Sequence, residues 1–519
     1  MRTKNAIKNI AMSLFSQIVI IILGFVSRKV FIDNLGAEYL GVNGLLTNLL
    51  SMMILIESGI GISIVYNLYR PLAENDKDKI IALVQLYKKA YRVLALIMLI
   101  ISCGLYPLLG FIMKSDESIK GMFIVYSIFV AKNIISYFNA YKWALINADQ
   151  KGYVLARSNL MFQIVTTISK IIILMITQSY IIFLLMEIGI FILQNIINTF
   201  IVYKRYPYLR EKTKYSIGSD TKANINKNVR AMFLHNIGGY LVFSTDNILI
   251  STFISVKAVG LYSNYTMVIG QLGALLSPVI GGIGAGVGNL IATEGEEKTY
   301  EVFEISYFVS FWIYSFSTIF LYILLQPFIN WWIGEGYLLD QFTFIVILIN
   351  FYLNGMRGPI STFKNKAGMF VQDKYVPVIE GLINLIASLM LIKYFGLVGV
   401  FLGTTLSTLL TVFWNQPRIV YKNLFKLPVK AYFIKYAMYI LVAFFAGAIT
   451  VITCRTLISG HSFISLIAKG IICVVIPNLI YILIFFRTKE FKAIYNLIKN
   501  NLPKAEVVKR LFKRVYKYI

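Results

Sequence analysis

Long apolar segments recur along this sequence from its beginning almost to its end. Each covers roughly twenty residues, the length that an α-helix needs to cross a hydrocarbon core about 30 Å thick. Unpaired backbone groups are costly in hydrocarbon, so a membrane-spanning segment must be a helix or part of a closed barrel. The ~10-residue alternation of barrel strands is absent here. The chain is therefore predicted to be an all-α membrane protein that crosses the bilayer many times.

Composition agrees with this prediction. The 519 residues are 58% hydrophobic and only 14% charged, and the mean hydropathy is +0.72, which exceeds the usual apolar share of soluble domains. We predict about fourteen transmembrane helices. Their ranges are 10–32, 40–68, 90–113, 121–145, 154–177, 180–203, 230–256, 259–291, 302–325, 341–363, 374–393, 396–416, 431–454 and 464–486.

The net charge of +26 could suggest nucleic-acid binding. The positions of the charged residues distinguish this from a role in membrane orientation. With the N-terminus inside, about 40 of the 50 Lys and Arg residues fall at cytoplasmic helix ends and about 8 fall outside. The acidic loop at 293–298 is an exception, but acidic residues count little in this rule. The charge therefore predicts orientation, with both termini cytoplasmic, and no nucleic-acid partner.

The longest polar stretch lies between the sixth and seventh predicted helices and divides the chain into two halves. The last two helices fall outside both halves and look like an addition. The tail is basic and amphipathic, so it is predicted to lie on anionic headgroups, with partner binding as the alternative. The predicted domains are a six-helix bundle at 1–203, a cytoplasmic basic linker at 204–229, a second six-helix bundle at 230–425, helices 13 and 14 at 426–486, and the tail at 487–519.

A short repeated string suggests that the two halves are pseudo-symmetric. Asn5-Ala6-Ile7-Lys8-Asn9 precedes the first helix, and Asn224-Ile225-Asn226-Lys227-Asn228 precedes the seventh. The distance from Asn5 to Gly41 is 36 residues, and so is the distance from Asn224 to Gly260. Few other identities share this offset, so duplication and coincidence both remain open. Duplicated halves would be related by an axis along the membrane normal, with a site between them near mid-membrane.

No set of residues typical of catalysis or of metal binding is present in the sequence. The only histidines are His235 and His461, and no HExxH or GxSxG pattern occurs. Cys103, Cys454 and Cys473 lack CxxC spacing and are expected to pack as small hydrophobic residues. We therefore expect no catalytic residues, no metal and no cofactor.

Basic residues within the apolar segments are expensive in lipid and are candidates for function. Arg28 and Lys29 lie near the outer end of the first helix, where they could reach the headgroups or face a cavity. Lys132 and Lys170 lie deeper, where reaching the headgroups is harder. These residues predict a water-filled, basic cavity.

Acidic residues also occur within the apolar segments. Glu57, Glu187, Asp246 and Glu380 are the acidic counterparts of the buried basic residues. Each could be functional, or could pair with a nearby lysine or cap a bent helix. The sequence does not choose between these alternatives.

The tenth predicted helix ends in a basic segment that includes Arg357, Lys364 and Lys366. Gly358-Pro359 is expected to break the helix there and to leave backbone groups and positive side chains open to an anion. The alternative is an ordinary cytoplasmic helix end.

Aromatic residues cluster after the ninth predicted helix, at Trp331, Trp332 and Tyr337. Trp and Tyr are enriched where a membrane meets water. This cluster therefore predicts an aromatic belt at that interface.

Several short strings resemble one family and appear in the same order over nearly the whole chain. They are Asn34-Leu35-Gly36-Ala37-Glu38-Tyr39-Leu40-Gly41-Val42-Asn43-Gly44-Leu45, Glu57-Ser58-Gly59-Ile60-Gly61, Ala148-Asp149-Gln150-Lys151, Ser244-Thr245-Asp246-Asn247-Ile248, Val259-Gly260-Leu261-Tyr262-Ser263-Asn264-Tyr265, Thr362-Phe363-Lys364, Gln372-Asp373-Lys374-Tyr375, Glu380-Gly381-Leu382-Ile383-Asn384-Leu385, Lys393-Tyr394-Phe395-Gly396 and Gly399-Val400-Phe401-Leu402-Gly403-Thr404. Together they resemble the Wzx-type polysaccharide repeat-unit flippases of the multidrug/oligosaccharidyl-lipid/polysaccharide (MOP) exporter superfamily.

The resemblance implies two six-helix bundles that alternate between inward-open and outward-open states in a bacterial plasma membrane. The implied cargo is an oligosaccharide repeat unit on undecaprenyl pyrophosphate, moved to the outer leaflet for capsule or exopolysaccharide assembly. Substrate binding would fall to Arg28, Lys29, Lys132, Lys170, Arg357 and Lys364. A coupling proton or sodium ion would fall to Glu57, Asp246 and Glu380. A polysaccharide polymerase and a chain-length regulator are the protein partners that the resemblance allows.

Two other functions compete with this hypothesis. A drug or cation antiporter of the same superfamily would typically have twelve helices and an acid-rich cavity. A membrane-embedded glycan polymerase or ligase would need long outer loops with Asp, Arg or His. The two additional helices, the embedded basic residues and the short predicted outer loops favour the flippase.

Overall fold

The computed structural model describes residues 2–51, 65, 67–72, 74–114, 121–149, 151, 153–211, 215, 245–369, 372–460 and 462–501. The chain divides into two compact units. We call them unit 1, which contains Met1–Gln271 and Tyr375–Ser407, and unit 2, which contains Leu272–Lys374 and Thr408–Ile519. Each unit is described by itself below.

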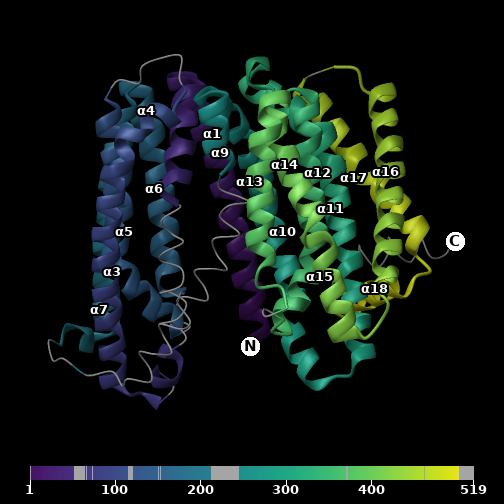
Figure 1. The fold of residues 1–519 in the computed structure, drawn as a ribbon, viewed down its shortest axis with the longest axis horizontal. Coiled ribbons are helices and arrows are strands. Elements are labelled where there is room, and N and C mark those ends of the chain that lie inside the picture. Colours follow the sequence, from purple (N-terminus) through teal and green to yellow (C-terminus); the bar gives the residue numbers. More distant parts are fainter. Residues whose placement is uncertain are drawn as a thin grey trace. The chain divides into compact units, whose positions relative to one another are not determined.

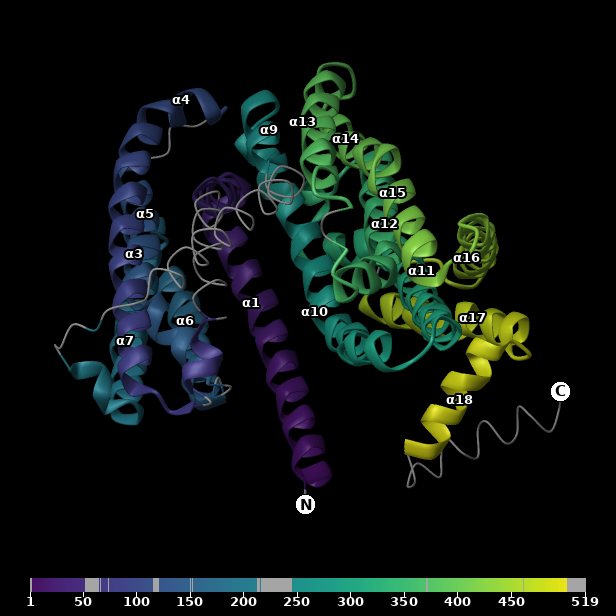
Figure 2. The ribbon, with the colours of Figure 1, turned by 60° about the horizontal axis from the view of Figure 1, so that its bottom comes forward.

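Unit 1 is helical throughout its described part. Helices α3, α5, α6 and α7 lie side by side, and α1 packs against α6, α5 and α9 (Figures 1 and 2). Helix α13 packs against α9 and, through Gly399, against α14. The elements are α1 (Arg2–Ser51), α3 (Lys77–Leu105), η1 (Tyr106–Leu108), α4 (Leu109–Ile112), α5 (Met122–Ala148), α6 (Tyr153–Thr177), α7 (Tyr180–Arg205), η2 (Pro207–Arg210), α9 (Asp246–Phe253), α10 (Val256–Thr293, continuing into unit 2), α13 (Val376–Phe395) and α14 (Leu397–Leu410, ending in unit 2).

Each copy of the repeated string is followed by a helix break at the corresponding position. Helix α1 is interrupted at Gly36, whose φ of 80° lies in the region that glycine tolerates best. In the second half, α9 ends at Phe253 and α10 begins at Val256, so the break falls at Ile254 and Ser255. Ser255 lies 219 residues after Gly36, the same offset that separates Asn5 from Asn224. This agreement supports duplication over coincidence.

Unit 2 contains the remaining helices. Helix α11 packs against α12, α16, α17 and α18, so the two C-terminal predicted spans are joined to the bundle through α11. Figure 2 shows α18 beyond the end of α17. The elements are α11 (Glu296–Ile333), η3 (Glu335–Tyr337), α12 (Gln341–Lys366), α15 (Val412–Val420), η4 (Tyr421–Phe425), α16 (Lys430–Leu457), α17 (Phe463–Phe485) and α18 (Lys489–Asn501).

An aromatic core holds α11, α16 and α17 together. Phe311 of α11 stacks on Tyr439 of α16 with ring centroids 4.2 Å apart, and it also contacts Tyr481 and Phe485 of α17. Offset and edge-to-face ring pairs add about 0.5–1.5 kcal/mol each beyond the burial of apolar area. In α18, Phe491 stacks on Trp312, so part of the apolar face of this helix is covered by protein.

Nine helices in the described part of the chain are long and apolar enough to cross a membrane. The prediction of an all-helical chain with many spans is therefore confirmed. One local prediction is wrong: Gly358-Pro359 does not break its helix, because α12 continues to Lys366. Pro359 removes one backbone donor, but the buried neighbours Ile360 and Phe363 hold this turn in the core.

Candidate functional site

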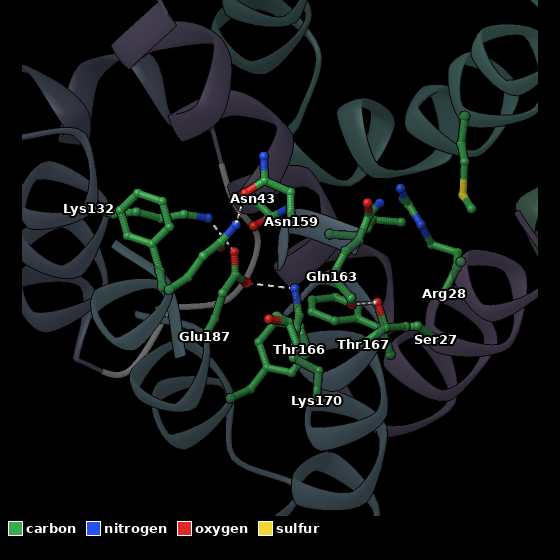
Figure 3. Close-up of a pocket in the computed structure, with 17 residues that line it drawn as sticks. Ser27, Arg28, Asn43, Lys132, Asn159, Gln163, Thr166, Thr167, Lys170 and Glu187 are labelled. Atoms are coloured by element: carbon green, nitrogen blue, oxygen red, sulfur yellow. Dashed lines mark hydrogen bonds and ion pairs between the residues drawn. The ribbon is translucent and has the colours of Figure 1, made fainter. Parts of the chain in front are cut away.

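A cavity of about 460 Å³ lies within unit 1 among α1, α5, α6, α7 and the first part of α10. Its lining includes three basic side chains and one acidic side chain, so the cavity carries a net positive charge. The charged residues are Arg28 of α1, Lys132 of α5, Lys170 of α6 and Glu187 of α7 (Figure 3).

Glu187 is shared by two of the lysines. Its Oε1 accepts from Lys132 Nζ, and its Oε2 accepts from Lys170 Nζ at 2.6 Å, as the dashed lines in Figure 3 show. The side chains are partly open, with exposed fractions of 39% for Lys132, 21% for Lys170 and 19% for Glu187. Lys170 Nζ also lies over the ring of Phe183, 4.4 Å from the ring centroid. One carboxylate therefore orients two ammonium groups and neutralises only one of them.

Arg28 lies on a different side of the cavity (Figure 3). Its Nη1 donates to Ser263 Oγ of α10 at 2.9 Å, across 235 residues of sequence. Ser263 also donates to the backbone oxygen of Gly260, which fixes its hydroxyl as an acceptor for the arginine. In the described part of the chain, Arg28 has no carboxylate partner. Its remaining guanidinium donors are therefore available to an anion in the cavity.

Neutral polar residues form a stripe along α6 that faces the cavity. The stripe follows the spacing of one helix face, and Gln194 of α7 donates to its first member, Asn159, at 3.0 Å. Its members are Asn159, Gln163, Thr166 and Thr167, and the charged Lys170 continues the same face. Hydroxyl and amide groups of this kind can exchange hydrogen bonds with sugar hydroxyls.

A second polar group in unit 1 is built on α13 and α14. Glu380 and Asn384 are one helical turn apart on α13, and both are buried. Asn384 Nδ2 donates to Thr404 Oγ1 of α14 at 2.9 Å. Helix α9, which begins at Asp246, packs against α13, and one oxygen of Asp246 is buried without a hydrogen-bond partner in the described part of the chain. Carboxylate and amide oxygens are ligands that hard cations prefer, but no metal-ligand group of three or more acidic, His or Cys residues occurs among the described residues.

The structure is similar to three solved transporters. It matches the lipid II flippase MurJ in an inward closed conformation, with a TM-score of 0.64 and 14% identity, over 92% of this chain and 99% of that chain. It also matches an inward-facing multidrug resistance MATE transporter of the MOP superfamily, with a TM-score of 0.56 and 12% identity, over 78% of this chain and 98% of that one. The third match is a variant of the Vibrio cholerae MATE transporter VcmN, with a TM-score of 0.53 and 13% identity, over 80% and 99%. No protein-family model and no curated protein matches the sequence.

This chain has the MOP-transporter fold. The match covers nearly the full length of both this chain and MurJ, so the fold class predicted from the sequence is confirmed. Identities of 12–14% establish the MOP fold but not a cargo. The predicted domain boundaries and the orientation of the termini remain predictions.

The MOP fold brings only some of the predicted binding residues together. Arg28, Lys132 and Lys170 line the cavity of unit 1. Lys29, next to Arg28, is instead paired with Asp33 at 2.9 Å on an exposed part of α1. The roles of these residues in binding remain predictions.

The other predicted residues lie elsewhere in the MOP fold. Arg357 and Lys364 belong to α12 in unit 2, and Lys364 is buried in an ion pair with Asp373. Glu57 lies outside the described residues. Lys364 is therefore already neutralised, and the cavity of unit 1 is lined by α1, α5, α6, α7 and the start of α10.

Sequence reasoning missed most of the neutral cavity lining. Glu187 was weighed as a functional residue, an ion-pair partner or a helix cap without a choice among these, and the stripe on α6 was not recognised. The spacing of Asn159, Gln163, Thr166 and Lys170 was a usable signal, because polar residues at intervals of three and four in an apolar helix mark one polar face.

Proposed function

We propose that this protein flips undecaprenyl-pyrophosphate-linked oligosaccharide repeat units from the inner to the outer leaflet of a bacterial plasma membrane by alternating access, for capsule or exopolysaccharide assembly. The observation that carries the proposal is the excess positive charge of the cavity. Arg28 keeps guanidinium donors free, while Lys132 and Lys170 share a single carboxylate. A pyrophosphate is the anionic group that such a site suits, because guanidinium and ammonium groups form charge-assisted hydrogen bonds to phosphate oxygens.

The neutral part of the lining supports a sugar as the rest of the cargo. Asn43, Asn159, Gln163 and Gln194 offer both donors and acceptors to hydroxyl groups. Phe31, Phe183 and Phe191 supply apolar surface beside them. Small-molecule sites usually combine apolar and aromatic side chains with a few polar groups that fix the orientation of the ligand.

A drug or cation antiporter is the competing function within the same fold. A cationic drug would meet the positive charge of Arg28, Lys132 and Lys170, and this repulsion disfavours it. The similarity to MurJ, which is described as a lipid II flippase, supports a lipid-linked cargo.

Ion coupling is assigned to the acidic residues of unit 1. Glu380 is buried one helical turn before Asn384, which donates to Thr404, and Asp246 begins the helix that packs against α13. A proton or sodium ion bound there would couple the gradient to the state of the transporter, because a ligand shifts an equilibrium between two conformations by its differential affinity. Glu57 is retained as a third candidate.

The function can be tested with purified full-length protein in liposomes. The probe is undecaprenyl pyrophosphate carrying one fluorescently labelled sugar, and a membrane-impermeant quencher reports how fast the label crosses between leaflets. We expect wild-type protein to accelerate crossing and Arg28→Gln to reduce the rate at least about tenfold, because loss of one charge-assisted contact costs about 1.5–3 kcal/mol.

Lys393→Gln is the control, because Lys393 is an exposed lysine that does not line the cavity. It should retain the wild-type rate. A wild-type rate no faster than that of empty liposomes would contradict the flippase, and gradient-driven efflux of a cationic dye would favour the antiporter.

A further inference from the structure

A second polar cavity, of about 450 Å³, lies in unit 2 and is unrelated to the cationic cavity of unit 1. It is formed at the end of α11, the start of α12, the end of α16 and the start of α17. Its lining includes Arg455 and Lys469 together with the amides of Gln326, Asn330 and Gln341. The described lining residues include no Asp or Glu, so the cavity is cationic.

Arg455 and Lys469 both have hydrogen-bond donors that are not used within the described part of the chain. Lys469 Nζ gives one hydrogen bond, to the backbone oxygen of Gly460 at 3.2 Å. Arg455 is exposed and has no ion pair or hydrogen bond in the described part of the chain. Gln326 Nε2 donates a hydrogen bond to the backbone oxygen of Leu339. This bond holds the α11–α12 connection beside the cavity. An anion with several oxygens could therefore bind between Arg455 and Lys469.

Neighbouring aromatic residues place this cavity at the membrane surface. Trp331 directly follows Asn330 of the lining, and it stacks on Phe463 at the start of α17 with ring centroids 4.7 Å apart. Both rings are about half exposed, at 48% and 50%. Exposed Trp side chains mark the level of the lipid headgroups. The anion that reaches Arg455 and Lys469 is thus at headgroup depth.

A larger apolar cavity, of about 670 Å³, lies directly below the polar one. It is formed by α11, α12 and α16 and shares Tyr322 and Val451 with the polar cavity, so the two adjoin. Apart from two hydroxyls on α11 and those of two tyrosines, its lining consists of hydrophobic side chains and small residues. On α16 the lining runs from Ile440 to Ile452.

The length of the apolar cavity matches one leaflet. Twelve residues separate Ile440 from Ile452, which is about 18 Å along a helix at ~1.5 Å per residue. Half of a ~30 Å hydrocarbon core is about 15 Å. A lipid acyl chain that starts at headgroup depth would therefore fill the groove to about the middle of the bilayer.

We propose that this adjoining pair of cavities is a binding site for an anionic phospholipid, with its headgroup phosphate between Arg455 and Lys469 and an acyl chain in the groove between α16 and the α11/α12 pair. The charge pattern of the sequence predicts that this end of the helices faces the outer leaflet. The site would bind a lipid of the surrounding bilayer and is separate from the cargo cavity of unit 1.

A phospholipid explains both halves of the site, whereas a soluble anion explains only one. Inorganic phosphate could pair with the basic residues, but it would leave the apolar groove without an occupant. A zwitterionic lipid could fill the groove, but its positive headgroup would lie near Arg455 and Lys469. Anionic charge and an acyl chain are therefore both required for strong binding.

Native mass spectrometry of the full-length protein in mild detergent tests this site. The probes are phosphatidylglycerol, phosphatidylcholine and inorganic phosphate, each titrated separately, and inorganic phosphate is also added to the complex with phosphatidylglycerol. We expect one phosphatidylglycerol to bind more tightly than phosphatidylcholine. Arg455→Gln with Lys469→Gln should weaken phosphatidylglycerol binding about thirtyfold, since each basic side chain near a headgroup contributes about 1 kcal/mol.

A matched control removes the same charge at the same predicted membrane face. Lys257→Gln with Lys393→Gln changes two exposed lysines that line neither cavity, and it should leave binding unchanged. Ala448→Trp fills the apolar groove and should weaken binding of phosphatidylglycerol without removing a charge.

Three outcomes would overturn the proposal. The first is equal affinity for the two lipids in the wild-type protein. The second is equal loss of phosphatidylglycerol binding in the control pair. The third is displacement of the lipid by inorganic phosphate together with no effect of Ala448→Trp, which would mean that the site takes a free anion. Lipid binding does not depend on cargo, so these results are independent of the flipping assay.

Discussion

Gly41 and Gly260 lie against each other's helices in a reciprocal contact. A Cβ added to Gly41 would be 1.9 Å from the backbone oxygen of Val256, and a Cβ added to Gly260 would be 2.0 Å from the backbone oxygen of Ala37. Val256 precedes Gly260 by four residues, as Ala37 precedes Gly41. The duplicated positions therefore contact each other where α1 crosses α10, with each glycine against the helical turn that precedes the other.

Replacing either glycine with alanine is expected to disrupt this crossing. Since a methyl group would collide with rigid backbone, Gly41→Ala or Gly260→Ala should destabilise the protein by about 3 kcal/mol or more. Gly270→Ala is the control, because nothing lies within 4 Å of the added atom and alanine favours the helix. Thermal unfolding in detergent measures the effect, and equal melting temperatures for all three variants would refute the contact.

The shared carboxylate of Glu187 predicts an ordered series of variants. Lys132→Gln or Lys170→Gln alone leaves one lysine to pair with Glu187, so we expect a folded protein whose flipping rate falls about tenfold. The double variant leaves Glu187 partly buried without either lysine, which should cost about 3 kcal/mol of stability. Adding Glu187→Gln should restore stability but not transport. Melting temperature and flipping rate, measured together, separate these effects, and an unchanged rate in the double variant would make both lysines structural.

Asp149, just after α5, predicts a dependence of stability on pH. Partial burial alone would raise its pKa, but hydrogen bonds from Lys151 and from Tyr206, the latter at 2.6 Å, outweigh burial and lower the pKa below its usual range. A lowered pKa contributes stability above the unfolded-state pKa of about 3.9, and this contribution is lost as the pH falls through the folded-state pKa. Asp149→Asn should therefore cost up to about 1 kcal/mol at pH 7.

The same variant should cost progressively less as the solution becomes acidic. Comparing melting temperatures of wild type and Asp149→Asn at neutral and acidic pH measures this change. Tyr206→Phe is the intermediate case, because it keeps the ion pair of Asp149 with Lys151. A difference between wild type and Asp149→Asn that stays constant with pH would show that the carboxylate does not contribute in its charged form.

Lys435 is predicted to hold α18 against the bundle. Its Nζ donates to Glu304 of α11 and, at 2.6 Å, to Glu490 of α18, and all three side chains are mostly buried. Lys435→Met would leave two carboxylates close together without their cation, at a cost of about 3 kcal/mol. We expect faster tryptic cleavage after Arg487, between α17 and α18. Lys430→Met, which changes an exposed lysine on the same helix, should leave the cleavage rate unchanged.

The candidate site was only partly predictable from the sequence. Lys132 and Lys170 were identified because a charge inside an apolar segment is costly in any membrane fold. Lys364 was selected because a helix break at Gly358-Pro359 was expected to leave it open to an anion, but it is neutralised by Asp373 nine residues later, and the sequence could not show this pairing. Helix α12 continues through Pro359 because burial of the neighbouring side chains outweighs the tendency of proline to break a helix.

The sequence alone determined that this protein is helical and spans a membrane many times, because backbone hydrogen bonds in lipid must be satisfied within each segment. It also contains the repeat, because Gly41 and Gly260 each lie 36 residues after the start of the repeated string. Only the tertiary structure decided that Glu187 joins two lysines and that Arg28 binds Ser263, 235 residues away. Such pairs depend on which faces of distant helices meet, and hydropathy carries no information about that.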